Sequence, residues 1–357
     1  MPLIIAEAGV NHNGSEELAI ELVDKAYQSG ADIVKFQTFK ANKLVTQTAE
    51  KASYQKSNTG NSGSQLSMLE KLELSFDSFK RIKQHCDELG IEFLSTAFDS
   101  ESLNFLVNDI GIKRLKIPSG EINNAPLILE HAATGLDLIV STGMSTLDDI
   151  YNVLAVIAYG LINGNKDPED IKDFKSAYQS SEGKLLLRKK VTLLHCTTEY
   201  PAPLNEINLN AMKLMNEEFH LPIGYSDHSN GILVSIAASS LGANIIEKHF
   251  TLDKSMEGPD HKASLNPDEL KELVQSIRQV QIALGNKEKT PSKSELKNIS
   301  IARKSLVALK DIKQGDVFNN ENLGCKRPGS GITPLRYWEL IGKQAKVDFI
   351  AGELIHE

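Results

Sequence analysis

The chain has 357 residues, of which 41% are hydrophobic and 24% charged, which is ordinary globular composition and enough length for one large domain and a small one. Its net charge of −8, without a long basic run, argues against a general nucleic-acid binder. The cysteines Cys86, Cys196 and Cys325 are scattered and form no disulfide framework, and the N-terminal apolar run is too short for a signal peptide or a membrane span. We therefore expect a soluble cytoplasmic protein that binds neither nucleic acid nor membrane.

Eight short apolar runs rich in β-forming residues alternate with amphipathic helical stretches. The predicted strands span residues 3–8, 32–39, 91–98, 114–121, 138–143, 191–197, 222–227 and 244–250. The first helical stretch begins after the N-cap residue Ser15 and ends at Gly30, and the last begins at Asn266, which is spaced for a capping box with Glu269. Eight β-then-α units in about 285 residues predict an α/β fold, a (β/α)8 barrel. A doubly wound open sheet is the alternative, although no GxGxxG follows the first strand.

Two polar regions interrupt this alternation. Residues 41–68, which include NTGNSGSQ, are expected to form a long loop after the second strand, and residues 163–184 a surface insertion before the sixth. After Gly285 the apolar periodicity is lost. We therefore assign residues 1–285 to the barrel, 286–300 to a linker or solvated helix, and 301–357 to a small, mostly β domain.

Polar residues gather where the predicted strands end, which is the edge that carries the active site in a (β/α)8 barrel. In chain order these residues are Glu7, Asn11, His12, Lys35, Gln37, Ser95, Thr96, Lys116, Ser119, Glu121, Ser141, Thr142, His195, Thr197, Ser226, Asp227, His228, Glu247 and His249. A Gly-Pro turn after the last strand adds Asp260 as a candidate for substrate contact. Cys196 has no obvious partner base and is expected to be a small core residue.

Lys35 and Lys116 lie inside otherwise apolar strands, where an unpaired ammonium group is costly, so each needs an anion. One interpretation is an internal salt bridge with Glu7, Glu121 or Glu247. The hydroxyl residues expected nearby are Thr96, Ser119, Ser141 and Ser226. So many hydroxyl groups beside two lysines favour a pocket for a phosphate or a carboxylate.

His228 and His249 end two neighbouring strands, each close to a carboxylate. A single strand-end histidine is more often a hydrogen-bonded structural residue, but two at one barrel mouth are equally consistent with a metal site. Imidazoles with oxygen ligands suit Mn²⁺, Fe²⁺, Co²⁺ or Zn²⁺, and a sphere with only two strong ligands leaves positions for water or substrate. These residues alone predict a metal-assisted enzyme for a small phosphorylated or carboxylated substrate, with carbon–carbon bond formation and hydrolysis both open.

Several motifs follow one another from Leu3 nearly to the end of the chain. They are IAEAGVNHNG, VKFQTFKA, FLSTAFD, KIPSGEINN, STGM, LLHCTTEYPAP, GYSDHS, IEKHFTLDKSMEGPDH and KRPGSG. In this order they resemble the sialic acid synthase family, which implies a TIM barrel followed by an antifreeze-like (SAF) domain. The resemblance further implies condensation of phosphoenolpyruvate with an N-acetylmannosamine-type sugar, giving N-acetylneuraminate or N,N′-diacetyllegionaminate and, by C–O cleavage, phosphate. Pseudaminate synthase, another phosphoenolpyruvate-dependent sugar-acid synthase and a non-catalytic sugar-binding barrel are the alternatives.

The resemblance also implies roles for particular residues. His228 and His249 match the ligands of a divalent metal, most often Mn²⁺ with Mg²⁺ or Co²⁺ as alternatives, and together with Glu7, near the reacting carbons, they are the expected catalytic residues. The residues that match the phosphoenolpyruvate pocket are Lys35, Thr96, Lys116, Ser119, Ser141 and Ser226. The residues that match sugar contacts are Gln37, Glu121, Tyr200 and Asp260. Arg327 matches an arginine that reaches the sugar's N-acetyl group in the barrel of the partner subunit, which implies a domain-swapped homodimer.

Two positions depart from part of the family. Thr198 stands where some members carry an asparagine facing the ligands, and residues 303–305 replace an aromatic stretch of some N-acetylneuraminate synthases. Both departures leave the acceptor open between N-acetylmannosamine and 2,4-diacetamido-2,4,6-trideoxymannose. We expect the pocket near Thr198 and Gln37 to make that choice.

Overall fold

The structure is a computed structural model that describes residues 1–60 and 63–356. Asn61 and Ser62, which belong to the segment predicted as a loop, and Glu357 lie outside the described residues. The chain forms two compact units, Met1–Gly285 and Asn286–Glu357, and each is treated by itself below.

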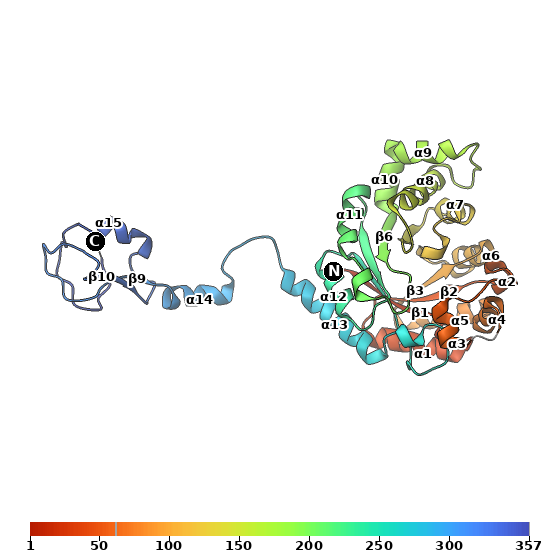
Figure 1. The fold of residues 1–357 in the computed structure, drawn as a ribbon, viewed down its shortest axis with the longest axis horizontal. Helices are drawn as coiled ribbons and strands as arrows, with labels where there is room; N and C mark the ends of the chain where they lie inside the picture. Colours follow the sequence, from red (N-terminus) through yellow and green to blue (C-terminus); the bar gives the residue numbers. More distant parts are fainter. Residues whose placement is uncertain (61–62, 357) are drawn as a thin grey trace. The chain divides into compact units, whose positions relative to one another are not determined.

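The first unit is a closed barrel of parallel strands (Figure 1). The strands are β1 (Leu3–Gly9), β2 (Ile33–Thr38), β3 (Glu92–Ala97), β4 (Arg114–Ile117), β5 (Asp137–Ser141), β6 (Val191–Cys196), β7 (Ile223–Asp227) and β8 (Ile245–His249). β1 pairs with both β2 and β8, which closes the sheet. The predicted (β/α)8 barrel is therefore confirmed, and the open sheet is excluded.

Helices cover the outside of the barrel (Figure 1). In this unit they are α1 (Glu16–Ser29), α2 (Ala41–Leu44), α3 (Ser53–Thr59), α4 (Gln65–Leu72), α5 (Phe76–Leu89), α6 (Ser100–Asn104), the π-helix η1 (Phe105–Ile110), η2 (Ser119–Glu121), α7 (Ala125–Ala133), α8 (Leu147–Asn163), α9 (Ile171–Gln179), α10 (Ser181–Lys190), η3 (Leu204–Glu206), α11 (Asn210–Phe219), α12 (Leu233–Ser240), η4 (His261–Ala263) and α13 (Pro267–Leu284). Their ends follow the predicted signals: the Ser15 hydroxyl accepts from the Leu18 amide at 3.2 Å, and Asn266 and Glu269 form the capping box of α13.

The barrel interior is layered because side chains alternate between the two faces of each strand. Apolar side chains fill a lower layer, formed by Ile5, Ile33, Leu94, Ile139, Leu194 and Ile245. Two residues further along each strand the side chain again points inward, now at the C-terminal edge. Outward side chains such as Ile4 and Val34 join the helices in the main core. The packing that fills the lower layer therefore also directs the next inward residue of each strand towards the mouth.

The prediction that residues 41–68 form a long loop is wrong as regards secondary structure. The segment contains α2, α3 and the start of α4. Ser64 caps α4 by accepting from the Ser67 amide at 3.2 Å. Met68 of α4 packs in a small apolar cluster under the segment. The polar composition thus hides short helices that become stable through a cap and a few tertiary contacts.

Residues 163–184, predicted as a surface insertion, form the end of α8, α9 and the start of α10. Phe174 of α9 packs edge-on against Tyr159 of α8, with ring centroids 5.3 Å apart. The insertion is therefore a helical extension anchored on α8.

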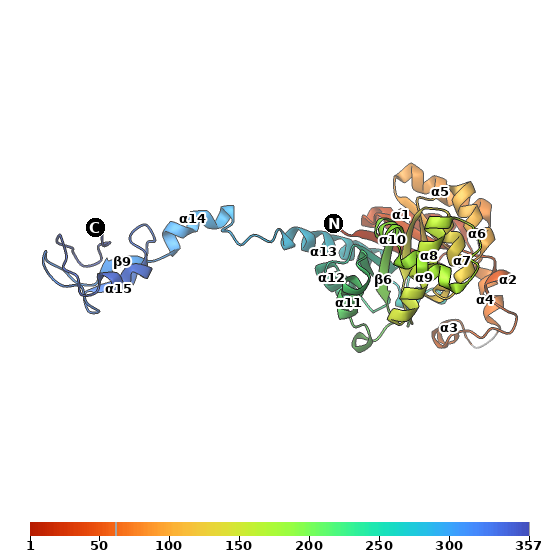
Figure 2. The ribbon, with the colours of Figure 1, turned by 90° about the horizontal axis from the view of Figure 1, so that it is seen from above.

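The second unit begins with α14 (Lys293–Ala302), which lies mostly in the segment predicted as a linker or solvated helix. It continues as β9 (Ser305–Ala308), β10 (Leu323–Lys326), η5 (Pro334–Arg336) and α15 (Tyr337–Leu340) (Figure 2). β9 and β10 pair antiparallel, and isolated bridges connect further segments. Leu306, Phe318 and Phe349 belong to its own apolar core. The prediction of a small, mostly β domain is confirmed.

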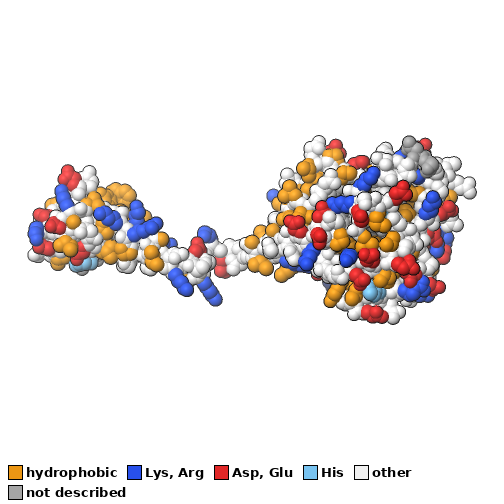
Figure 3. All heavy atoms as spheres, turned by 90° about the horizontal axis from the view of Figure 1, so that it is seen from below, with side chains coloured by type: hydrophobic (Ala, Val, Ile, Leu, Met, Phe, Trp, Pro, Cys, Tyr) orange, Lys and Arg blue, Asp and Glu red, His pale blue; other side chains and the backbone are white. Residues whose placement is uncertain are grey.

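Surface charges of both signs are interspersed over the face of the barrel drawn in Figure 3, which shows no continuous basic stripe there. Among the helices of residues 1–60 and 63–356, none combines the length and the apolar character needed to cross a membrane.

Candidate active site

A polar cavity of about 180 Å³ lies at the C-terminal ends of the barrel strands. It is lined by Glu7, Lys35, Gln37, Thr96, Phe98, Lys116, Pro118, Ser119, Gly120, Ser141, Cys196, Thr198, Tyr200, Ser226, His228, Glu247 and His249. Each strand contributes to this lining the inward residue just beyond the level of the apolar layer. The residues predicted to be catalytic and those predicted to form the anion pocket therefore meet in one cavity.

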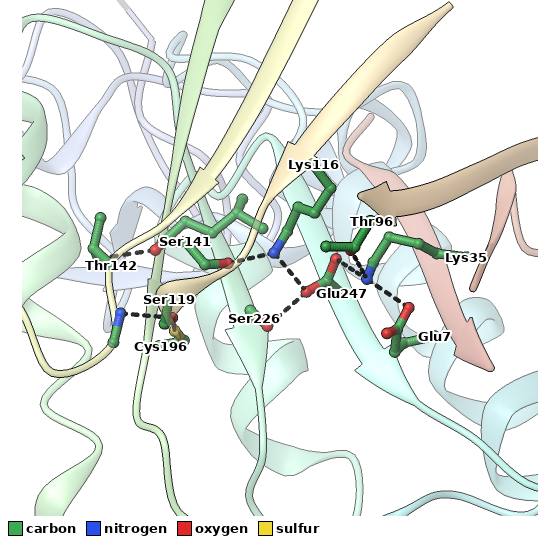
Figure 4. A network of polar contacts seen from close by, with 12 residues as sticks. Glu7, Lys35, Thr96, Lys116, Ser119, Ser141, Thr142, Cys196, Ser226 and Glu247 are labelled. Atoms are coloured by element: carbon green, nitrogen blue, oxygen red, sulfur yellow. Dashed lines mark hydrogen bonds and ion pairs between the residues drawn. The ribbon is translucent and has the colours of Figure 1, made fainter. Parts of the chain in front are cut away.

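Buried charged side chains form the centre of the cavity (Figure 4). The Lys35 ammonium lies 2.7 Å from Glu7 Oε2 and 3.6 Å from Glu247 Oε2. The Lys116 ammonium lies 3.4 Å from Glu247 Oε1 and donates to Ser141 Oγ at 2.6 Å. The internal ion pairs expected for these lysines are thus present. They lie next to the hydroxyl groups that favour the second interpretation, a pocket for a phosphate or a carboxylate.

The buried charges alter one another's affinity for protons. Burial raises the pKa of Glu7 to about 7, although Lys35 opposes the shift. Burial would also raise the pKa of Glu247, but Lys116 and Lys35 outweigh it and hold this pKa at about 2. Glu247 therefore stays ionised at neutral pH, whereas Glu7 gains and loses a proton there.

His228 and His249 lie at the mouth with ring centroids 5.6 Å apart. His228 Nδ1 donates to the carbonyl oxygen of Thr197 at 2.6 Å, and its Nε2 lies 3.1 Å from the Tyr200 hydroxyl. The buried Nδ1 of His249 has no hydrogen-bond partner among the described residues. Burial lowers the pKa of His228 to about 4 and that of His249 well below its usual range. Both imidazoles are therefore neutral at pH 7 and keep a lone pair.

Two of the residues predicted for the sugar line the cavity. Gln37 donates to Glu7 Oε1 at 3.3 Å. The ring of Tyr200 packs against His228 with centroids 4.1 Å apart. Both side chains therefore lie beside the catalytic candidates.

The other residues predicted for the sugar lie outside this lining. Asp260 is buried. Burial raises the pKa of nearby Tyr200, and the charge of Asp260 raises it further. Glu121 accepts a hydrogen bond from Asn124 at 2.7 Å. Arg327 belongs to the second unit, where its Nε donates to the carbonyl oxygen of Ala302 at 3.0 Å and the side chain is exposed.

Several cavity residues lie outside the predicted set. Glu247 is predicted at a strand end and as a salt-bridge partner but receives no catalytic or binding role, although its position two residues before His249 puts both on the inward face. Cys196 is buried as expected but also lines the cavity, with Sγ 3.1 Å from the Ser119 hydroxyl. Next to the cavity, the ring of Tyr54 packs against that of Tyr200 in a tilted arrangement with centroids 4.9 Å apart, and no sequence pattern indicates this contact.

Comparisons with known proteins recover the same two parts of the chain. The sequence model of the NeuB family matches residues 22–289, and that of the SAF domain matches residues 303–357. The N,N′-diacetyllegionaminic acid synthase of Campylobacter jejuni is 51% identical over 99% of both chains. The enzyme of the same name from Legionella pneumophila is 46% identical over 98% of this chain and 92% of its own. A crystal structure of N-acetylneuraminic acid (sialic acid) synthetase from Leptospira borgpetersenii with citrate has a TM-score of 0.66 at 30% identity, covering 84% of this chain and 90% of its own.

Proposed function

The chain belongs to the NeuB family, and from this premise we propose that it condenses phosphoenolpyruvate with 2,4-diacetamido-2,4,6-trideoxymannose to give N,N′-diacetyllegionaminate and phosphate. The observation that carries the choice of product is the nearly full-length similarity to two synthases of that acid. The cavity supports the reaction class independently, because it combines buried ammonium groups for an anionic substrate with neutral imidazoles at a barrel mouth.

In this proposal phosphoenolpyruvate binds to Lys35, Thr96, Lys116, Ser119, Ser141 and Ser226. Glu7 and Glu247 neutralise the lysines before the substrate enters, which avoids the cost of burying unpaired ammonium groups. The hydroxyl of Thr96, 3.3 Å from Lys35 Nζ, supports the assignment because it provides a neutral donor beside the charge. The phosphate and carboxylate of the substrate would exchange part of these ion pairs for charge-assisted hydrogen bonds.

His228 and His249 are the proposed protein ligands of a divalent metal, with Mn²⁺ as the expected ion. Their fit is supported by two neutral imidazoles and by the buried, unpartnered Nδ1 of His249. Residues 1–60 and 63–356 contain no group of three or more His, Cys, Asp or Glu side chains that could hold a metal, so water or substrate would complete the coordination. When bound, the metal would supply Lewis-acid polarisation of the sugar's aldehyde oxygen.

Glu7 is the proposed proton acceptor. After C3 of phosphoenolpyruvate bonds to the aldehyde carbon, water must add to C2 and the C2–O bond to phosphate must break. A carboxyl whose pKa burial raises to about 7 suits removal of the proton from that water at neutral pH. Gln37, which donates to Glu7 Oε1, fixes the orientation of the carboxyl group.

The acceptor sugar is proposed to contact Gln37, Glu121, Tyr200 and Asp260. Thr198 is a further candidate, because its buried hydroxyl oxygen has no hydrogen-bond partner among the described residues and lies in the cavity wall. A substrate group that paired with this hydroxyl would remove the cost of leaving it unsatisfied. Thr198 and Gln37 are therefore the proposed positions at which the enzyme distinguishes the diacetamido sugar from N-acetylmannosamine.

Arg327 is proposed to complete the site of a second subunit by contacting the sugar's N-acetyl group in a domain-swapped homodimer. Its exposed side chain supports this role. Co-expression of Glu7→Gln and Arg327→Ala chains tests the exchange. Each variant alone should be inactive. Random pairing makes about half of the dimers mixed, and each mixed dimer has one intact site of two, so the mixture should have about a quarter of wild-type activity. Failure of the mixture to regain activity would contradict the shared site.

The direct test measures phosphate release from phosphoenolpyruvate in the presence of Mn²⁺. A reductant is added because the cysteines are free, as expected of the proposed cytoplasmic enzyme, and must be kept reduced. We expect kcat/KM to be highest with 2,4-diacetamido-2,4,6-trideoxymannose. Preference for N-acetylmannosamine would make N-acetylneuraminate the product, and preference for the pseudaminate precursor would make the chain a pseudaminate synthase. A chain that released no phosphate with any of the three sugars would not be a nonulosonic acid synthase.

A further inference from the structure

A fully buried ion pair lies in the barrel wall, directly before the two histidines in sequence. Lys248 Nζ lies 3.1 Å from Asp227 Oδ2, and the side chains are 1% and 0% exposed. The two residues are opposite each other in the register of β7 and β8. Since side chains alternate along a strand, the pair points towards the helix layer, while the next residues, His228 and His249, line the cavity.

The ion pair also holds the turn that carries His228. Asp227 Oδ1 accepts from the amide of Ser229 at 2.8 Å and from its hydroxyl at 2.7 Å, and Oδ2 accepts from the Ser235 hydroxyl on α12 at 2.6 Å. Lys248 Nζ donates to the carbonyl oxygen of Ser229. Both backbone polar groups of Ser229 are therefore held by the pair, and His228 has little freedom to move relative to β7 and β8.

We propose that the Asp227–Lys248 ion pair positions His228 and His249 for metal binding, and so sets the metal affinity, without touching metal or substrate. The inference rests on the proposed function, since it takes the histidines as metal ligands. A buried ion pair adds little stability compared with apolar residues of similar size, so stability alone does not account for one here. Groups that orient metal ligands from behind typically change metal affinity by 10–100-fold.

The test is a titration of the free protein with Mn²⁺, followed by the electron paramagnetic resonance signal of the unbound ion, without substrates or turnover. Lys248→Met should raise the Kd for Mn²⁺ by about 10–100-fold. Because this change leaves the Asp227 carboxylate buried without its counter-ion, it should also lower Tm. The double variant Asp227→Asn/Lys248→Met removes both charges. We expect it to regain much of the lost Tm while its Kd stays at least about tenfold raised.

Ser235→Ala is the variant least able to disturb folding, since it removes one hydroxyl that contacts Asp227. It should raise the Kd several-fold. The matched control is Glu92→Gln, which breaks the ion pair between Glu92 and Arg114, the first residues of β3 and β4. Their Nε–Oε1 distance is 2.7 Å. That control should lower Tm and leave the Kd unchanged.

The outcomes separate this inference from the proposed function. If the wild type binds Mn²⁺ and the Kd of the double variant and of Ser235→Ala equals the wild-type value, the ion pair serves stability alone and the positioning role is wrong. If the wild type binds no Mn²⁺, the assignment of His228 and His249 as metal ligands is wrong, and the inference fails with it. A raised Kd together with a regained Tm supports the positioning role.

Discussion

Replacing Asp260 with asparagine is expected to stabilise the barrel at neutral pH. Asp260, in the segment that connects β8 to α13, is buried, and burial raises its pKa from 3.8 to about 6. Between these two values the folded chain holds a proton that the unfolded chain has released. The wild type is therefore relatively more stable in acid, and this contribution is lost as the pH rises through about 6. Asparagine has no such dependence because it does not ionise.

The magnitude follows from the shift. A shift of roughly two pH units, at about 1.4 kcal/mol for each, disfavours the charged folded state by ~3 kcal/mol at pH 7.5. At pH 4.5 most of the folded chains are protonated at this position, and the same relation leaves ~1 kcal/mol. The cost of burying the asparagine amide is the same at both values. The free energy of unfolding of Asp260→Asn, relative to that of the wild type, should therefore be ~2 kcal/mol lower at pH 4.5 than at pH 7.5.

Urea unfolding of both proteins at the two pH values measures this difference. Far-UV circular dichroism is the appropriate signal, because the single tryptophan, Trp338, lies in the second unit and does not report on the barrel. Asp253→Asn is the matched control. Asp253 is exposed in the same segment, and a hydrogen bond from the Ser255 amide lowers its pKa from 3.8. Its carboxyl therefore titrates below pH 4.5, and the control should show almost no change between the two pH values. A difference between Asp260→Asn and wild type that stays constant with pH would refute the reasoning.

The same variant also tests the proposed contact with the sugar. If the Asp260 carboxylate accepts a hydrogen bond from the acceptor, Asp260→Asn should raise the KM for the sugar by about tenfold, since a hydrogen bond to a charged group contributes about 1.5–3 kcal/mol. The KM for phosphoenolpyruvate should not change. Equal KM values for the sugar in variant and wild type would remove Asp260 from the acceptor site.

Further predictions concern the centre of the cavity and its wall. Glu7→Gln should retain phosphoenolpyruvate binding in calorimetry but lose about 10²–10⁴-fold in kcat, and normal turnover would remove Glu7 from the mechanism. In the wild type, kcat/KM should fall as the pH drops below about 7, because protonated Glu7 cannot accept a proton, and a flat profile from pH 8 to 6 would contradict this. Lys116→Met should raise the KM for phosphoenolpyruvate by about 10–100-fold through loss of a charge-assisted hydrogen bond, with the KM for the sugar as the internal control. Thr198→Val should weaken the preference for the diacetamido sugar, and an unchanged ratio of kcat/KM values for the two sugars would locate the choice elsewhere. Treatment with EDTA should abolish phosphate release, and added Mn²⁺ should restore it; undiminished release in the presence of EDTA would show that the reaction needs no metal.

The barrel and the direction of its polar residues could be predicted because both depend on neighbours in sequence. The period of two along β2 puts Ile33 in the apolar layer and Lys35 at the mouth, and the same spacing relates Glu247 to His249. Local hydrogen bonding fixes the ends of α1 and α13, so Ser15 and Asn266 mark them correctly. The short helices within residues 41–68 escape this reasoning, since their stability depends on apolar contacts with the rest of the unit.

Local sequence patterns suffice to predict the eight strands, their inward polar ends and the helix caps, because periodicity and capping act over a few residues. The closed barrel, by contrast, places Glu247 between Lys35 and Lys116, so that two neighbouring carboxyl groups have opposite pKa shifts. The register of β7 and β8 likewise places Lys248 opposite Asp227, so that the two buried charges form an ion pair. These relations depend on the register and closure of strands that are far apart in sequence, and no local pattern specifies them.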